Sequence, residues 1–244
     1  MKGTADYETN YAGLPFEDTL RRFRNDALLK ILRASRSRKI LEIGPGAWPV
    51  CSDYPDFERM VIVEPGAAFF HDIQRLCAHD SRIEIHNGYF EKIAQELGDE
   101  DFDMIIIGGF LHEIDNPEEV LKTVLSISGK DTRVYSLVPN SRSFHRQLAV
   151  ESGLIANAVE PSALDRMFQR RRVYDRNGFI ELFETAGFKV LESGTYFLKP
   201  FTHEQMQQLI DQGFLTDKIQ GGLDKMVRHF PEMGAEIYVV AQKN

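Results

Sequence analysis

Two glycines and a carboxylate at the end of an apolar run are the residues of this chain best suited to hold a ligand. Residues 39–43 read Lys-Ile-Leu-Glu-Ile, and Gly44 and Gly46 follow at once. Glycines at such a point let backbone N–H groups approach a ligand that side chains would otherwise block. Glu42, just before them, favours a cationic or hydroxyl-bearing partner. The pattern indicates a loop that binds a nucleotide-like cofactor.

A strand must position this loop, and the chain repeats the arrangement. Strands are expected at residues 39–43, 60–64, 82–86, 102–107 and 132–138, with helical patterns between them. Strands that alternate with helices predict a parallel sheet with right-handed crossovers. Ligands bind outside the carboxyl ends of such strands, so we expect one functional rim. The turns expected on that rim are Gly44–Gly46, Glu64, Asn87–Tyr89, Gly108–Glu113 and Asn140.

The remaining segments predict helices that cover the sheet and an antiparallel end to that sheet. Residues 17–34 have the apolar spacing of an amphipathic helix. Residues 141–176 are irregular and rich in arginine, which suggests a cap over the rim. Strands are expected over 188–197 and 235–241, separated by a helical stretch at 203–229, and this order predicts an antiparallel end to the sheet. Shorter helices are expected over 67–78 and 177–186, and from Pro117 onward.

The expected fold class is therefore α/β, a Rossmann-like three-layer sandwich. Its seven-stranded sheet would be mostly parallel with an antiparallel last strand, and a helical arginine-rich cap would be added. We expect one domain over residues 1–244, with residues 1–35 as an N-terminal helical lid and residues 141–176 as a cap that receives substrate.

Composition narrows the class of partner. The 244 residues are 43% hydrophobic, enough for one large domain. No apolar run approaches the roughly 20 residues that span a bilayer, and the N-terminus lacks the apolar core of a signal peptide. Two cysteines make neither a disulfide framework nor a metal site, so a cytoplasmic protein without a metal is expected. The net charge of −8 argues against a nucleic-acid binder and favours a small-molecule or carbohydrate partner.

Two kinds of cofactor loop are compatible with Gly44 and Gly46. Nicotinamide enzymes carry Gly-x-Gly-x-x-Gly followed by an acid that holds the ribose. Methyltransferases dependent on S-adenosylmethionine carry an acid-x-Gly-x-Gly-x-Gly segment and a similar ribose acid. Pro49 and Trp48 occupy the positions of the third glycine in the two patterns. The loop alone therefore leaves both cofactors open.

The surroundings of the loop favour the second cofactor. Glu42 stands where the methyltransferase pattern has its acid, and a carboxylate there would repel a pyrophosphate but favour the cationic amino group of a methionine. Residues 102–107 and 110–113 resemble the methyltransferase strand and the turn after it. Residues 188–190 and 236–240 resemble the antiparallel pair that closes the same sheet.

Over residues 17–244, the chain thus resembles the class I S-adenosylmethionine-dependent methyltransferases. Its C-terminal half is similar to a subgroup found with bacterial glycan and natural-product biosynthesis. The resemblance implies that Glu64 accepts hydrogen bonds from the ribose hydroxyls. Where the family has an acid that receives the adenine amino group, this chain has Tyr89, and Glu91 is a second candidate for that contact. Trp48 would form a bulky wall, and Tyr7 and Tyr11 could fold over the cofactor. The cofactor-binding residues implied are Glu42, Gly44, Pro45, Gly46, Glu64, Pro65, Gly88, Tyr89, Phe90, Gly109, Phe110 and Leu111.

The methyl of S-adenosylmethionine is already electrophilic, so the enzyme must place a nucleophile in line and remove its proton. His112 has a suitable ordinary pKa for that base, although packing under the cofactor is the alternative. His145 is a competing base. The arginines favour a phosphate, carboxylate or uronic acid on the substrate. The substrate residues implied are Glu113, Asn140, Arg171 or its neighbour Arg172, and Tyr174.

The expected function is O-methylation of a small molecule or sugar by a monomer or homodimer. N-methylation is the alternative within the class, and an amine needs no base because it can attack directly. A cofactor-binding subunit of a biosynthetic complex, without methyl transfer, is the alternative from a different class.

Overall fold

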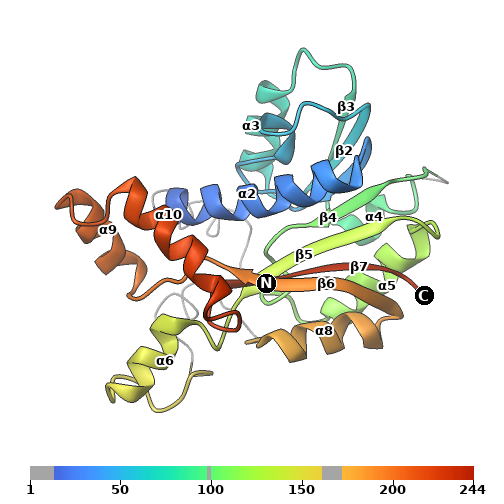
Figure 1. Cartoon of the computed structure of the whole chain (residues 1–244). Coiled ribbons are helices and arrows are strands. Elements are labelled where there is room, and N and C mark those ends of the chain that lie inside the picture. The colour runs from blue at the N-terminus through green and yellow to red at the C-terminus, as the bar shows by residue number, and fades with distance from the viewer. Residues whose placement is uncertain (1–13, 98–99, 161–171) are drawn as a thin grey trace.

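A single twisted sheet organises the chain (Figure 1). The structure is a computed structural model that describes residues 14–97, 100–160 and 172–244. The sheet has seven strands in the order β3-β2-β1-β4-β5-β7-β6. The strands are β1 (Lys39–Ile43), β2 (Arg59–Glu64), β3 (Ile83–Asn87), β4 (Met104–Ile107), β5 (Arg133–Pro139), β6 (Phe188–Tyr196) and β7 (Glu236–Lys243).

Strand directions confirm the predicted fold class. Strands β1 to β5 pair in parallel, whereas β7 runs antiparallel between β5 and β6. The last strand of the chain is therefore the antiparallel one, as expected. It follows from these pairings that the carboxyl ends of β1 to β6 and the amino end of β7 share one rim.

Both faces of the sheet are covered, which explains the continuous apolar runs. Along β1, Ile40 belongs to one buried cluster and Leu41 to the other, because successive side chains of a strand point to opposite faces. Helices α2 (Glu17–Ser35) and α3 (Ala67–Leu76) cover the face on which Ile40 lies. The face on which Leu41 lies is covered by α4 (Phe90–Ile93), α5 (Pro117–Ile127) and α8 (Arg176–Thr185).

Three more helices lie beyond the carboxyl ends of the strands, on the left of Figure 1: α6 (Phe144–Glu151), α9 (His203–Asp211) and α10 (Asp217–Lys225). The single helical stretch predicted at 203–229 is wrong in detail. Gly213, at a φ of 76°, follows the end of α9, and the Thr216 side chain caps the start of α10. A short 3-10 helix, Met226–Arg228, follows α10.

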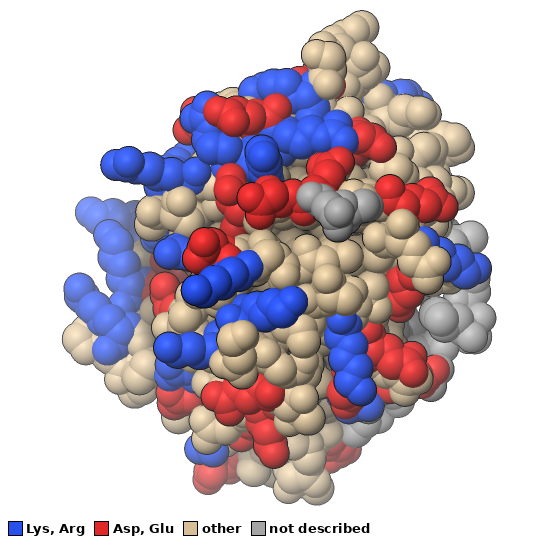
Figure 2. Space-filling model, turned by 90° about the vertical axis from the view of Figure 1, so that its right-hand side faces the viewer, with Lys and Arg blue, Asp and Glu red and all other residues tan. Residues whose placement is uncertain are grey.

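The cap predicted at 141–176 is described only in part. Helix α6 belongs to it, whereas Arg166, Arg170 and Arg171 lie outside the described residues, as do Tyr7 and Tyr11. Among the helices that the structure describes, none is long and apolar enough to cross a membrane. Figure 2 shows a face on which acidic and basic side chains are intermixed.

Candidate active site

The loop after β1 has the backbone that its glycines predict. Gly44 and Gly46 both adopt left-handed conformations, with φ of 65° and 64°, which side chains rarely adopt. A Cβ on Gly44 would lie 3.0 Å from the Phe110 ring. The loop after β1 and the turn after β4 are thus packed directly on one another.

Sequence reasoning missed the tightest point of this contact, Gly108. A Cβ there would lie 2.2 Å from the carbonyl oxygen of Gly44. The Gly108 N–H donates to the carbonyl of Ile43 at 2.8 Å, which holds the ends of β1 and β4 together. The pair Gly108–Gly109 after a buried strand was the only sign in the sequence that the backbones come this close.

Glu42 is buried on the sheet face covered by α2 and α3. The Val50 N–H donates to both of its carboxylate oxygens, at 2.9 and 3.2 Å. Burial raises the pKa of Glu42 to about 8, the Val50 N–H opposes this, and the Glu64 carboxylate adds to it. A proton bound to the Glu42 carboxyl group, or a cation close to it, would therefore offset the cost of burying its negative charge.

Glu64 ends β2 beside the same loop and is 4% exposed. One of its oxygens accepts the N–H of Gly46 at 3.0 Å, and the other accepts the N–H of Gly66 at 2.7 Å. The backbone of the loop and of the turn after β2 thus orients the Glu64 carboxylate.

The end of β3 lies next to Glu64. The Asn87 side chain donates to the Glu64 carbonyl at 2.9 Å, and the Gly88 N–H donates to the same oxygen at 3.2 Å. Tyr89 is 44% exposed, whereas Phe90, the first residue of α4, is buried in the core. Of this predicted adenine segment, Tyr89 is the residue whose ring is accessible. Glu91, beside it, is exposed.

The turn after β4 brings the candidate base to the rim. His112 is 3% exposed, and its Nε2 lies 3.4 Å from a carboxylate oxygen of Glu113. Leu111 is fully buried in the core, while Gly109 and Phe110 remain partly exposed. The His112 carbonyl accepts the N–H of Arg172 at 3.2 Å, so the turn is joined to the C-terminal part of the cap segment.

Three predicted substrate residues, Asn140, Arg172 and Tyr174, are engaged in contacts within the protein. The Asn140 amide donates to the carbonyls of Glu232 and Gly234 at 2.9 and 2.8 Å, and its oxygen accepts the N–H of Arg142. Arg172 pairs with Glu118 at 2.8 Å. Tyr174 is buried and packs against Phe179, and Arg171 lies outside the described residues.

The second candidate base, His145, begins α6 on the opposite side of the rim. Burial lowers the pKa of His145 well below its usual range, and the charges of Lys199, His203 and Arg146 act in the same direction. His145 is therefore neutral at neutral pH. Sequence reasoning missed Lys199, which is only 2% exposed and donates to His203 at 2.9 Å.

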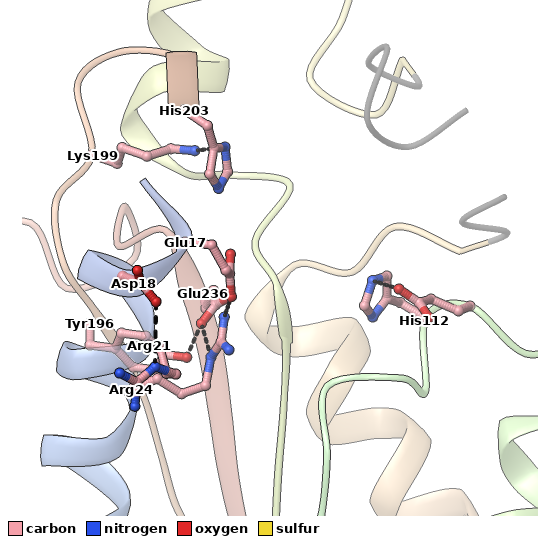
Figure 3. Close-up of polar contacts among 10 residues, drawn as sticks. Glu17, Asp18, Arg21, Arg24, His112, Tyr196, Lys199, His203 and Glu236 are labelled. Carbon is pink, nitrogen blue, oxygen red and sulfur yellow. Dashed lines mark hydrogen bonds and ion pairs between the residues drawn. The ribbon is translucent and has the colours of Figure 1, made fainter. Parts of the chain in front are cut away.

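A second missed feature ties α2 to the rim (Figure 3). The Arg24 guanidinium donates to both carboxylate oxygens of Glu236, at 3.0 and 2.7 Å, and lies 3.1 Å from Glu17. The Tyr196 hydroxyl also donates to Glu236. Arg21, on the same helix, lies over the Trp48 ring at 5.1 Å, so α2 covers the predicted wall of the loop.

The sequence profile of a family described as "Methyltransferase domain" matches residues 16–193. The chain belongs to this methyltransferase family. It is an enzyme, and its cofactor is S-adenosylmethionine. No curated protein sequence matched the chain in a separate search.

Solved structures share the fold of this methyltransferase at low identity. A possible histamine N-methyltransferase from Thermotoga maritima is 18% identical, with a TM-score of 0.61 over 99% of this chain and 98% of that one. The plantazolicin methyltransferase BamL is 14% identical, with a TM-score of 0.60 over 99% and 90%. The mitomycin 7-O-methyltransferase MmcR is 16% identical, with a TM-score of 0.51 over 86% and 50%. These likenesses show the fold alone.

The residues at the rim fit the cofactor of this methyltransferase. Gly44 and Gly46 carry no side chains at the two left-handed positions of the loop, and Glu64 presents a carboxylate held by two backbone N–H groups beside it. A ribose with two hydroxyl groups matches that carboxylate, and a cationic methionine end matches Glu42. Within the described part of the chain, no three His, Cys, Asp or Glu side chains group as metal ligands.

Glu42 should make the ligand-free methyltransferase less stable as pH rises. Below pH 4.5 the group is protonated in both the folded and the unfolded chain. Between there and about 8 only the unfolded chain releases the proton. The free energy of unfolding should therefore fall by about 1.4 kcal/mol per pH unit in this window. Urea unfolding of Glu42→Gln, which keeps an acceptor for Val50, should lack this loss.

Relative to wild type, Glu42→Gln should gain roughly 2 to 4 kcal/mol between about pH 5 and about pH 8. Glu181→Gln, at an exposed position on α8, is the matched control and should show no such gain. If the free energy of unfolding varied with pH in the same way in wild type and in Glu42→Gln, the pKa of Glu42 would not be raised in the folded chain.

Proposed function

We propose that this methyltransferase transfers a methyl group to an oxygen of a small organic molecule. The cofactor would lie over Gly44–Gly46, with its ribose on Glu64, its amino group toward Glu42 and its adenine beside Tyr89. It supplies a methyl group that is electrophilic without further activation. The task left to the chain is to hold the acceptor hydroxyl and to take its proton.

The observation that carries this proposal is the His112–Glu113 pair at the carboxyl end of β4. The imidazole is buried, and Glu113 lies 3.4 Å from its Nε2. Histidine is the side chain that most often serves as a general base. Phe110, two residues earlier, packs on Gly44 of the cofactor loop. The base thus belongs to the turn that contacts the cofactor loop.

His112→Asn should lower kcat for hydroxyl acceptors by about 10²- to 10⁴-fold. Its affinity for S-adenosylmethionine, measured by calorimetry, should change by less than about threefold, because the loop glycines and Glu64 are intact. Activity would be followed as the S-adenosylhomocysteine formed when the enzyme is given S-adenosylmethionine and a panel of phenols, alcohols and their matched amines. His79→Asn, at an exposed position, controls for loss of a histidine.

N-methylation is the second candidate, because a neutral amine attacks without a base. It would be favoured if amines were methylated and His112→Asn kept near wild-type rates on them. If His145→Ala alone abolished the activity on hydroxyl acceptors, the base would be His145 and the assignment to His112 would be wrong. No methylation of any hydroxyl acceptor would reject the O-methylation proposal.

A further inference from the structure

The two cysteines of the chain lie in contact, although they are 26 positions apart in the sequence. The Sγ atoms of Cys51 and Cys77 are 3.6 Å apart, and both cysteines are free thiols. Cys51 belongs to the short 3-10 helix Val50–Ser52, and Cys77 directly follows α3. An S–S bond is about 2.05 Å long, so the two Sγ atoms need to approach by about 1.5 Å to form one. The fold therefore places a pair of thiols where a disulfide requires only a small movement.

The pair is partly shielded but can be reached from the surface. Cys77 lines a groove between the end of α3 and β3, together with His79, Asp80 and Ile83. Cys51 is half-buried and packs against the core on the face covered by α2 and α3. Burial raises the pKa of both thiols, so the reduced pair is uncharged at neutral pH. Proximity is what favours reaction here, because a sulfur oxidised at either position meets the second thiol at once.

The cysteine pair adjoins the hydrogen bonds of Glu42. Val50, the residue before Cys51, donates its N–H to both carboxylate oxygens of Glu42, at 2.9 and 3.2 Å. Cys77 is held by its helix, since its own N–H donates to the Ile73 carbonyl at 2.9 Å. A disulfide would therefore draw the short turn at Cys51 toward the end of α3. Val50 would move with it and shift relative to Glu42.

We propose that Cys51 and Cys77 are a modification site, which a peroxide oxidises to a disulfide that weakens the hold on the methionine end of the cofactor. One thiol sulfur attacks the peroxide, becomes a sulfenic acid and releases water. The second thiol attacks that sulfur, the S–S bond forms, and the sulfenic oxygen leaves as water with the remaining proton. Both sulfurs are oxidised, and hydrogen peroxide is reduced to water.

The disulfide itself is independent of the proposed function. Its effect on the cofactor rests on the placement proposed above, with the amino group toward Glu42. A thiol reductant should reverse both the bond and its effect, because thiol–disulfide exchange returns the two cysteines to their free form.

The first measurement detects the bond. The reduced full chain is treated with excess hydrogen peroxide, denatured and digested without reductant. Mass spectrometry should find the peptides that contain Cys51 and Cys77 joined, with a mass two hydrogens below their sum, and dithiothreitol should separate them. Cys51→Ser, treated in the same way, should give no peptides joined within one chain.

The second measurement is calorimetry with S-adenosylmethionine. Oxidised wild type should bind it at least about fivefold more weakly than reduced wild type, and dithiothreitol should restore the affinity. Binding of 5′-methylthioadenosine, which lacks the amino-acid end, should differ by less than about twofold between the two forms. Cys77→Ser treated with peroxide should bind S-adenosylmethionine like reduced wild type, which controls for oxidation of methionines. If Cys77→Ser does not fold, Cys77→Ala replaces it, because alanine buries no hydroxyl group.

Peroxide treatment that leaves Cys51 and Cys77 unjoined would overturn the inference, as would a joined pair with unchanged affinity for S-adenosylmethionine. Equal weakening of S-adenosylmethionine and 5′-methylthioadenosine would overturn the route through Val50 and Glu42. No methyl acceptor enters these measurements, so a failure of O-methylation leaves them intact. If reduced wild type did not bind S-adenosylmethionine, the cofactor placement and the link to it would be rejected, while the joined peptides would still report the disulfide.

Discussion

Gly108→Ala should abolish tight cofactor binding and destabilise the fold by about 3 kcal/mol. The new methyl group would lie 2.2 Å from the carbonyl oxygen of Gly44 and 3.1 Å from that of Ile43. Both are backbone atoms, so neither can rotate away, and the ends of β1 and β4 must separate. The cofactor loop begins at that point. Affinity for S-adenosylmethionine should therefore fall by at least about tenfold.

Urea unfolding and calorimetry with S-adenosylmethionine measure the two effects. Gly221→Ala is the control, because a Cβ there meets open space within α10 and should stabilise the helix by up to about 1 kcal/mol. If Gly108→Ala is too unstable to titrate, Gly44→Ala gives a milder strain through its φ of 65° and the Phe110 ring. Wild-type affinity and stability in Gly108→Ala would contradict the close packing of the two strand ends.

Arg24→Met should lower the free energy of unfolding by about 3 kcal/mol. Arg24 bridges two largely buried carboxylates, at 3.1 Å from Glu17 and 2.7 Å from Glu236. Removing the guanidinium leaves like charges facing one another where α2 meets the start of β7. For a domain of this size the melting temperature should fall by roughly 6 to 12 °C. Denaturant unfolding and calorimetry both report the change.

A second substitution distinguishes lost charge pairing from lost packing. Glu236→Gln in the Arg24→Met background removes one of the two facing negative charges and should restore part of the stability, roughly 1 kcal/mol. Arg33→Met, an exposed arginine of the same helix, should cost no more than about 0.5 kcal/mol. A small effect of Arg24→Met, equal to that of Arg33→Met, would show that the network does not stabilise α2.

The strands and the functional rim could be predicted because their signals are local. Residues 104–107 are apolar without interruption since β4 is buried on both faces, and the two glycines after β1 adopt left-handed backbone. The break between α9 and α10 was predictable in principle from Gly213 and Thr216, but the surrounding helical pattern dominated. Local periodicity is a weak guide where a single turn interrupts a helical segment.

The amino-acid sequence by itself determined the order of strands and helices, the cofactor class and the place of the glycine loop after β1, because strand burial and glycine placement are encoded within a few residues. Only the tertiary structure decided which distant side chains meet. Arg24 and Glu236 are separated by 212 positions. Gly44 and Gly108 are likewise brought together only by the pairing of β1 with β4. Such contacts depend on how the chain folds back on itself, and no local pattern records that.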